Sequence, residues 1–323
     1  MTKGTGKCAR SVLVLGATGG IGGALARRFK AGGYEVVALH RRAEEMMTRL
    51  PDYRWVHGDA MDRHAVIAAA QGVSAIVHGV NPPGYQRWGE LVLPMIDHTI
   101  AAARAVGATI LMPGTLYNYG PDAFPLLKET SPQNPCSIKG AIRVELEQRL
   151  EQAAKEGVRV ILVRAGDFFG PGAGNNWFAQ GLIKPGKPVR AVTLPGRPGL
   201  GHSWAYLPDV AETCVRLLEK GEALPPFARF HMRGVYDADG LTMARAIAEA
   251  AGQNRLKIRR FAWWLVTALA PFVTLFREVK EMRYLWQEDI RLDNSLLVTT
   301  LGQEPNTPLP QAVLATLTSL KCL

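Results

Sequence analysis

Three glycines at fixed spacing, Gly16, Gly19 and Gly22, are the residues of this chain most suited to binding an anionic ligand. They follow a run of apolar β-formers and precede a helical pattern. The first glycine permits a tight turn, the second lets the backbone approach a pyrophosphate, and the third lets helix and strand pack closely. The N–H groups at the start of the helix then face the anion. The pattern predicts a dinucleotide-binding turn formed by Gly16, Thr18, Gly19, Gly20, Ile21 and Gly22.

Alternating strand and helix patterns position this turn. Further strands are predicted over 35–40, 53–56, 75–78, 109–112 and 158–164, and helices over 63–71, 92–106 and 141–156. Strands that alternate with helices favour an α/β fold of Rossmann type, a doubly wound parallel sheet. Ligands of such a sheet bind at the carboxyl ends of its strands.

The composition changes after Gly170. Glycine, proline and asparagine cluster over 170–201, which indicates long loops. Helical patterns resume over 210–220, 242–251 and 261–286. We therefore expect a dinucleotide-binding domain over 1–170, to which 202–235 returns, and a smaller, mixed substrate-binding lobe formed by 171–201 and 236–323.

The net charge of +10 is spread over short basic pairs, without a basic tail, so we expect no nucleic-acid partner. The four cysteines lie far apart and lack C-x-x-C spacing, which predicts reduced thiols, a cytoplasmic location and no metal site. Basic residues precede the first apolar run, but that run is the nucleotide strand and no small-residue cleavage site follows it. This argues against a signal peptide.

Further motifs follow the glycine turn in a fixed order: Gly-Asp at 58–59, TLYNYG at 115–120, RAGDFFGPG at 164–172 and HSWAYLPDVA at 202–211. With the turn, they resemble the short-chain dehydrogenase/reductase superfamily in its extended or atypical branch, the NAD(P)-dependent epimerase/dehydratase-like proteins. The resemblance covers about residues 11–217. Leu15 departs from it, because extended members usually carry threonine there. The resemblance implies hydride transfer to or from a nicotinamide.

The end of the second strand indicates which cofactor binds. NAD-preferring relatives place an acid there to bind the ribose 2′-OH, whereas this chain has His40, Arg41 and Arg42. A guanidinium can bind a 2′-phosphate with two hydrogen bonds, which predicts NADP(H) over NAD. The alternative is that both arginines simply end the strand in solvent. By resemblance, the rest of the cofactor site comprises Asp59 and Ala60 at the adenine, Gly79, Val80 and Asn81 near the ribose and nicotinamide, and Ala165 and Gly166.

The catalytic pattern of the family is incomplete in this chain. By resemblance, Thr115 orients the substrate oxygen. The family's Y-x-x-x-K motif is absent, because neither alignment of residues 134–150 supplies its tyrosine. Lys139 could instead donate the proton, since burial and the positive charge of Arg143 one turn away would lower its pKa. Tyr117 or Tyr119 could also supply a phenol, or proton chemistry could be lost, leaving Lys139 and Arg143 to bind ribose and phosphate.

Candidate substrate residues are Tyr117, Asp167, Asn175, Asn176, Trp177 and His202. The segment 261–277 is rich in aromatic residues and is preceded by basic ones. We expect a core or lid helix there. A homodimer face is the next possibility, and a membrane-surface segment, which would imply a lipophilic substrate, is a third that we do not favour.

Together with these patterns, the resemblance implies an NADP(H)-dependent oxidoreductase or epimerase-like enzyme that acts on a carbonyl or alcohol of a small organic substrate. The alternative is a non-catalytic NADPH-binding sensor or regulator. The missing tyrosine favours the alternative. Thr115 and an entire second lobe favour the enzyme.

Overall fold

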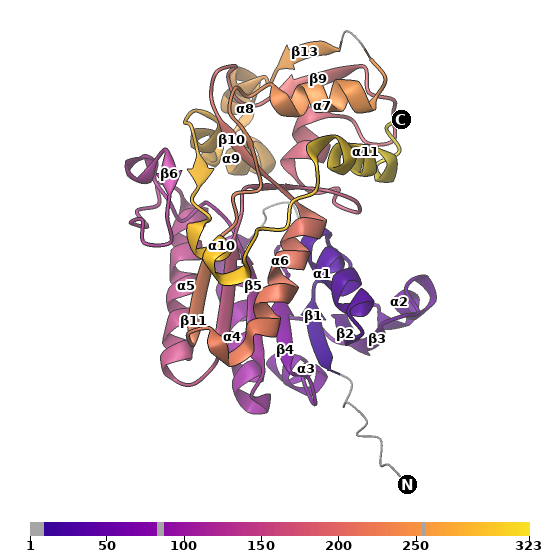
Figure 1. Cartoon of the computed structure of the whole chain (residues 1–323), viewed down its shortest axis with the longest axis vertical. Helices are drawn as coiled ribbons and strands as arrows, with labels where there is room; N and C mark the ends of the chain where they lie inside the picture. Colours follow the sequence, from indigo (N-terminus) through magenta and orange to yellow (C-terminus); the bar gives the residue numbers. More distant parts are fainter. Residues whose placement is uncertain (1–9, 83–86, 254–255) are drawn as a thin grey trace.

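The computed structural model describes residues 10–82, 87–253 and 256–323. Its centre is a seven-stranded sheet in which all neighbouring strands run parallel (Figure 1). In order across the sheet, the strands are β11 (Phe227–His231), β7 (Val160–Arg164), β5 (Thr109–Gly114), β4 (Ala75–His78), β1 (Ser11–Leu15), β2 (Glu35–His40) and β3 (Arg54–His57). The order reverses at β1, so the crevice beside β1 and β4 is where such a sheet binds its ligand.

Both faces of the sheet are buried under helices, as parallel sheets require. Successive side chains of β1 point to opposite faces: Val12 and Val14 belong to one apolar core, and Leu13 and Leu15 to the other. The helices of the first face are α1 (Gly20–Ala31) and α6 (Leu207–Lys220), and those of the second are α3 (Arg63–Ala69), α4 (Trp88–Val106) and α5 (Ile138–Lys155). Helix α2 (Ala43–Arg49) packs beside β3. This confirms the predicted doubly wound Rossmann-type fold.

A smaller lobe lies above the carboxyl ends of these strands (Figure 1). Its three-stranded sheet contains β8 (Asp167–Phe169), β10 (His202–Tyr206) and β12 (Val235–Asp237), and a two-stranded sheet pairs β9 (Ala191–Leu194) with β13 (Lys257–Arg260). The helices α7 (Thr242–Ala250) and α11 (Leu309–Ser319) complete a third apolar core. Outside it, β6 (Leu126–Leu127) pairs with β14 (Arg291–Leu292), and α10 (Ser295–Leu301) follows β14.

The predicted helix over 261–286 is wrong as a single element. The structure divides it into α8 (Trp263–Leu269), α9 (Thr274–Glu281) and a 3-10 turn at Arg283–Trp286. Pro271 stands between α8 and α9. Proline has no N–H group for the helical hydrogen bond and its ring clashes with the preceding turn, so a break here is expected.

The edge strand β11 is the one strand of the large sheet that the sequence patterns did not indicate. It carries Arg229 and His231 at alternate positions, which makes it look too polar for a buried strand. Within the described ranges, no helix is both long enough and apolar enough to cross a membrane.

Candidate active site

The glycine turn brings three backbone segments into van der Waals contact. Gly16 has a φ of +87°, which strongly favours glycine, and a Cβ there would lie 2.6 Å from the carbonyl oxygen of Gly79. A Cβ on Gly22 would lie 2.1 Å from the carbonyl oxygen of Gly16. Only glycine therefore fits at Gly16 and Gly22, and β1, β4 and α1 meet within a few ångströms. The predicted spacing of the turn has a direct steric cause.

The open side of the turn consists of backbone. Thr18 and Gly19 are exposed, Gly20 and Ile21 are half-buried, and Gly19 occupies the N-cap position of α1. No side chain caps this helix, which leaves its first N–H groups available to an anion. The turn therefore fits the pyrophosphate of a dinucleotide.

The end of β2 presents two guanidinium groups to solvent. The side chains of Arg41 and Arg42 are 78% and 71% exposed. Arg41 lies 3.7 Å from Asp59 Oδ2, and Arg42 lies 3.1 Å from a carboxylate oxygen of Glu45. His40 Nδ1 accepts a hydrogen bond of 3.1 Å from the backbone N–H of Arg42, which shapes the turn after the strand. The half-buried Asp59 and Ala60 follow the neighbouring strand β3.

The loop after β4 is tied to α5. Arg143 Nη2 donates a hydrogen bond of 3.1 Å to Asn81 Oδ1, and its guanidinium lies 4.9 Å from the ring centroid of Trp88. Arg143 therefore lies beside the expected ribose loop of Gly79, Val80 and Asn81. At the end of β4, burial and the charge of Arg143 lower the pKa of His78 to about 3, which keeps this side chain neutral.

Thr115 lies at the carboxyl end of β5 and lines a pocket of about 60 Å³. Its hydroxyl oxygen is buried and has no hydrogen-bond partner among the described residues. Because a buried hydroxyl without a partner is unfavourable, this atom is suited to a ligand oxygen. Other residues that line the pocket are Tyr117, Ala165, Gly166, Asp167, His202 and Ser203. The structure thus brings Tyr117, Asp167 and His202 to the same pocket as Thr115, together with Ala165 and Gly166.

His202 is fixed in this pocket by two contacts. Its Nε2 lies 2.8 Å from Asp167 Oδ2, and its ring stacks on Trp286 with centroids 3.8 Å apart and planes 10° from parallel. Strands β8 and β10 carry the two polar partners. A carboxylate paired with one imidazole nitrogen fixes the tautomer, which leaves the other nitrogen to transfer a proton.

Lys139 lies at the start of α5 and is almost fully buried. Its ammonium group forms ion pairs with Glu278 and Glu281 of α9 and lies 3.4 Å from the carbonyl oxygen of Glu278. The expected environment was positive, from Arg143, whereas the observed partners are two carboxylates. They come from a segment about 140 residues away, so local sequence gave no indication of them.

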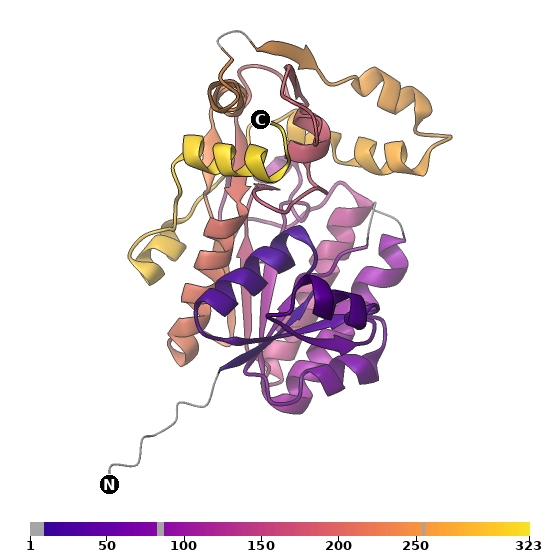
Figure 2. The same ribbon diagram turned by 90° about the vertical axis from the view of Figure 1, so that its right-hand side faces the viewer.

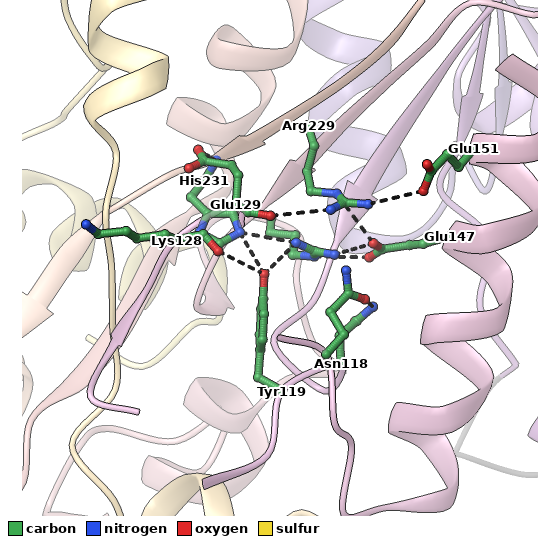
Figure 3. A network of polar contacts seen from close by, with 10 residues as sticks. Asn118, Tyr119, Lys128, Glu129, Glu147, Glu151, Arg229 and His231 are labelled. Carbon is green, nitrogen blue, oxygen red and sulfur yellow. Dashed lines mark hydrogen bonds and ion pairs between the residues drawn. The ribbon is translucent and has the colours of Figure 1, made fainter. Parts of the chain in front are cut away.

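Tyr119 belongs to a buried network of polar side chains and does not line the Thr115 pocket (Figure 3). Its hydroxyl accepts a hydrogen bond of 2.6 Å from Arg164 Nη1 and lies 3.0 Å from His231 Nε2. Arg164 also forms a two-pronged ion pair with Glu147 of α5. Arg229 approaches the same carboxylate, 3.8 Å from Glu147 Oε2.

The protonation states of this network follow from its burial. Nδ1 of His231 donates to the carbonyl oxygen of Leu127 at 3.2 Å, so Nε2 acts as the acceptor. Burial and the charge of Arg164 lower the pKa of His231 to about 3. Burial raises the pKa of Tyr119 to about 12, because it disfavours the phenolate. Tyr119 therefore contributes to packing around Arg164, a role that sequence reasoning missed. The sequence signal for such a network is a charged residue at a buried position of a helix or strand, as with Glu147 and Arg164.

Asn175, Asn176 and Trp177 lie outside the Thr115 pocket. They line a separate cavity of about 390 Å³ with residues of α8 and α9. Asn176 Oδ1 accepts a hydrogen bond of 2.8 Å from the N–H of Ala179 and so shapes the π-helical turn at Phe178–Leu182. Trp177 contacts Trp286, which also stacks on His202, so this indole connects the lining of the cavity to that of the pocket.

Comparisons with known proteins agree with this geometry. A model of the NAD dependent epimerase/dehydratase family matches residues 12–231. A 3-diazoavenalumate denitrifying reductase from a Streptomyces species is 31% identical over 179 residues, half of this chain and 58% of that protein. The match thus spans little more than half the length of that relative. A dTDP-4-dehydro-6-deoxy-D-allose reductase from Streptomyces bikiniensis is 24% identical over 273 residues, or 76% of this chain and 82% of that protein.

Solved structures share the whole fold at low identity. A UDP-glucuronic acid 4-epimerase from Bacillus cereus, in complex with NAD, superposes with a TM-score of 0.74 at 16% identity, covering 96% of this chain and 98% of the other. A nucleoside-diphosphate-sugar epimerase from Pseudomonas aeruginosa gives a TM-score of 0.70 at 19% identity, covering 97% of each chain. The likeness includes the smaller lobe as well as the large sheet.

Proposed function

Because the chain belongs to the NAD-dependent epimerase/dehydratase family of the extended short-chain dehydrogenase/reductase superfamily, we propose that it is an NADPH-dependent reductase. It would reduce a carbonyl group of a small organic substrate to an alcohol. The observation that carries this proposal is the buried Thr115 hydroxyl, which has no partner in the described structure and shares a pocket with the Asp167–His202 pair. The names of the two curated relatives, both reductases, support reduction as the direction.

The preference for NADPH rests on the end of β2. Arg41 and Arg42 are exposed there, and neither is held by a short, buried ion pair. Both guanidinium groups can therefore turn to a 2′-phosphate, which an acid at this position would repel. Asp59 and Glu45 already lie near the two arginines and would compete weakly with the phosphate.

The chain's own residues would act on the substrate as follows. When bound, NADPH supplies the hydride. Thr115 donates a hydrogen bond to the carbonyl oxygen and so places the carbon for attack. His202, oriented by Asp167, would act in its imidazolium form and give the oxygen the proton of its other ring nitrogen, so that the carbonyl gains one hydride and one proton. The proton returns to His202 from solvent, because this side chain is not completely buried.

His202 is favoured over the other possible proton donors by position. It lines the Thr115 pocket, whereas the Tyr119 hydroxyl lies in the Arg164 network and the Lys139 ammonium lies between two carboxylates. Tyr117 lines the pocket as well and is the second candidate. The proposal therefore assigns Lys139 a positioning role at the start of α5.

One observation favours a non-catalytic NADPH sensor as the second candidate function. Lys139, which one alignment places at the lysine of the missing Y-x-x-x-K motif, is engaged by Glu278 and Glu281. A lysine held in this way is poorly placed to activate a phenol. The sensor would bind the cofactor with the same glycine turn and Arg41.

The first test is a fluorescence titration with NADPH and, separately, NADH. We expect NADPH to bind more tightly, and Arg41→Ala to weaken NADPH binding by roughly tenfold while leaving NADH binding unchanged, since a charge-assisted hydrogen bond contributes about 1.5–3 kcal/mol before solvent screening. Arg54→Ala, at the opposite end of β3, is the matched control. Tighter binding of NADH would overturn the NADPH preference.

The second test follows NADPH consumption with a panel of aldehydes, ketones and nucleoside-diphosphate ketosugars. With a substrate from the panel, Thr115→Val and His202→Gln should each lower kcat by about 100-fold, the usual contribution of one positioned proton donor, without weakening NADPH binding. Tyr117→Phe and Lys139→Met separate the other candidates. NADPH binding without turnover of any panel member would favour the sensor.

A further inference from the structure

Helices α8 and α9 form an arm that extends from the smaller lobe (Figure 2). Its apolar side chains point into solvent to an unusual degree: Phe272, in the turn between the helices, is 84% exposed, Trp264 is 74% exposed, and Leu275 is 48% exposed. Leu265 and Val273 add to the same segment. Several large apolar side chains exposed within one short segment indicate an interaction surface.

A basic groove lies next to the arm. It has a volume of about 650 Å³, and its charged lining residues are Lys184, Lys187, Arg190 and Arg259. No carboxylate lines the groove among the described residues, and none of these four cations forms an ion pair there. Four uncompensated cations in one groove are suited to an anionic surface.

The groove and the arm are continuous. Phe261 lines the basic groove and also the apolar cavity beneath α8 and α9, and so do Gln180 and Gly181. Strand β13, whose residues are all exposed, ends at Arg260 and leads through Phe261 into α8. The same few residues therefore join the basic groove to the cavity that α8 and α9 line, and the chain runs directly from the groove into the arm.

We propose that this face docks on an anionic phospholipid bilayer. Trp264 and Phe272 would enter the region between headgroups and acyl chains, where aromatic side chains are favoured, and the basic groove would face lipid phosphates. This pairing of apolar tip and cationic flank is typical of segments that lie on a membrane without crossing it. It assigns to the arm the membrane-surface role that the sequence alone did not favour.

A second copy of the chain fits this face less well. A partner molecule would need to offer carboxylates to the four cations of the groove. The acids of the arm itself, Glu278 and Glu281, are engaged by Lys139. The net charge of +10 also makes two identical chains repel each other.

The test is co-sedimentation of the full chain with vesicles of phosphatidylcholine containing one-third phosphatidylglycerol, compared with vesicles of phosphatidylcholine alone. We expect binding to the anionic vesicles that weakens as salt is raised, because salt screens exposed charges. Trp264→Ser combined with Phe272→Ser should weaken this binding about tenfold or more, since the apolar contribution scales with buried area. The control pair, Leu296→Ser with Leu314→Ser, removes exposed leucines from α10 and α11 and should bind as the wild type does.

A second pair of variants separates local from overall charge. Lys187→Gln with Arg190→Gln removes two charges from the groove, and Arg63→Gln with Lys220→Gln removes two from other exposed positions. The groove variant should bind anionic vesicles several-fold more weakly than its control. The proposal is overturned by absence of binding at low salt, by equal loss in both charge variants, or by a concentration-dependent dimer that the Trp264 and Phe272 substitutions dissociate.

Discussion

Two buried cations near the candidate active site, Arg164 and Lys139, are compensated in different ways. Arg164 is fully buried and pairs with Glu147, whose side chain is also buried, inside the large domain. Lys139 is equally buried, but its partners Glu278 and Glu281 are partly exposed and come from α9. The first pair holds a core together, and the second holds the arm to the first turn of α5. A buried cation paired with carboxylates thus has a different structural consequence, depending on which elements the ion pair joins.

The largest effect on the free energy of unfolding is expected from Glu147→Gln. The change leaves the Arg164 charge buried without its counter-ion, and breaking such a pair costs about 3–5 kcal/mol. Urea unfolding followed by circular dichroism measures this loss. A loss below about 1 kcal/mol, the range of exposed ion pairs, would contradict this expectation. It would show that Arg229, Tyr119 and His231 keep their arrangement around Arg164 without Glu147.

Removing the two carboxylates that pair with Lys139 should destabilise the protein more than removing Lys139 itself. Glu278→Gln with Glu281→Gln strands a buried ammonium and should cost about 3 kcal/mol. Lys139→Met leaves two carboxylates that water can reach and should cost about 1 kcal/mol. The same unfolding measurement compares the two variants, and limited proteolysis of α9 reports release of the arm. Equal losses would mean that the carboxylates are as poorly solvated as the lysine.

The Arg164 network should also make stability depend on pH. His231 has a pKa of about 3 in the folded protein, below its value in the unfolded chain, so the unfolded state binds more protons between these values. Stability should therefore be complete above about pH 6.5 and decline as pH falls toward 3, by up to ~1.4 kcal/mol per pH unit from this residue. His231→Gln should flatten the decline. Identical slopes for the variant and the wild type would contradict the assignment of a neutral, buried imidazole.

The smallest effect on the free energy of unfolding is expected from Tyr119→Phe. Arg164 Nη1 keeps a contact of 3.2 Å with His231 Nε2, so the guanidinium is not left without partners. The lost hydrogen bond should cost about 1 kcal/mol. Turnover should be preserved, since Tyr119 lies away from the Thr115 pocket. A large loss of activity with intact stability would return Tyr119 to the list of proton donors.

Backbone-defined features could be predicted from the sequence, and long-range side-chain contacts could not. The glycine turn depends on steric limits at Gly16 and Gly22, which leave a local pattern, and the large sheet follows from the alternation of apolar strand segments with helical segments along the chain. The carboxylates that hold Lys139 lie about 140 residues further along the chain. The pairing of Asp167 with His202 depends on β8 and β10 lying side by side, and nothing local to either strand indicates that. Pro271 is the local signal for the break between α8 and α9, because proline cannot complete the helical hydrogen bond.

The ion pairs between α9 and Lys139 connect the arm mechanically to α5. Helix α5 carries Lys139 in its first turn and Arg143 one turn later, and Arg143 reaches Asn81 in the loop after β4. Any displacement of α9 must either pull this helix with it or leave a buried ammonium without its counter-ions. The position of the arm and that of the Asn81 loop are therefore connected through α5.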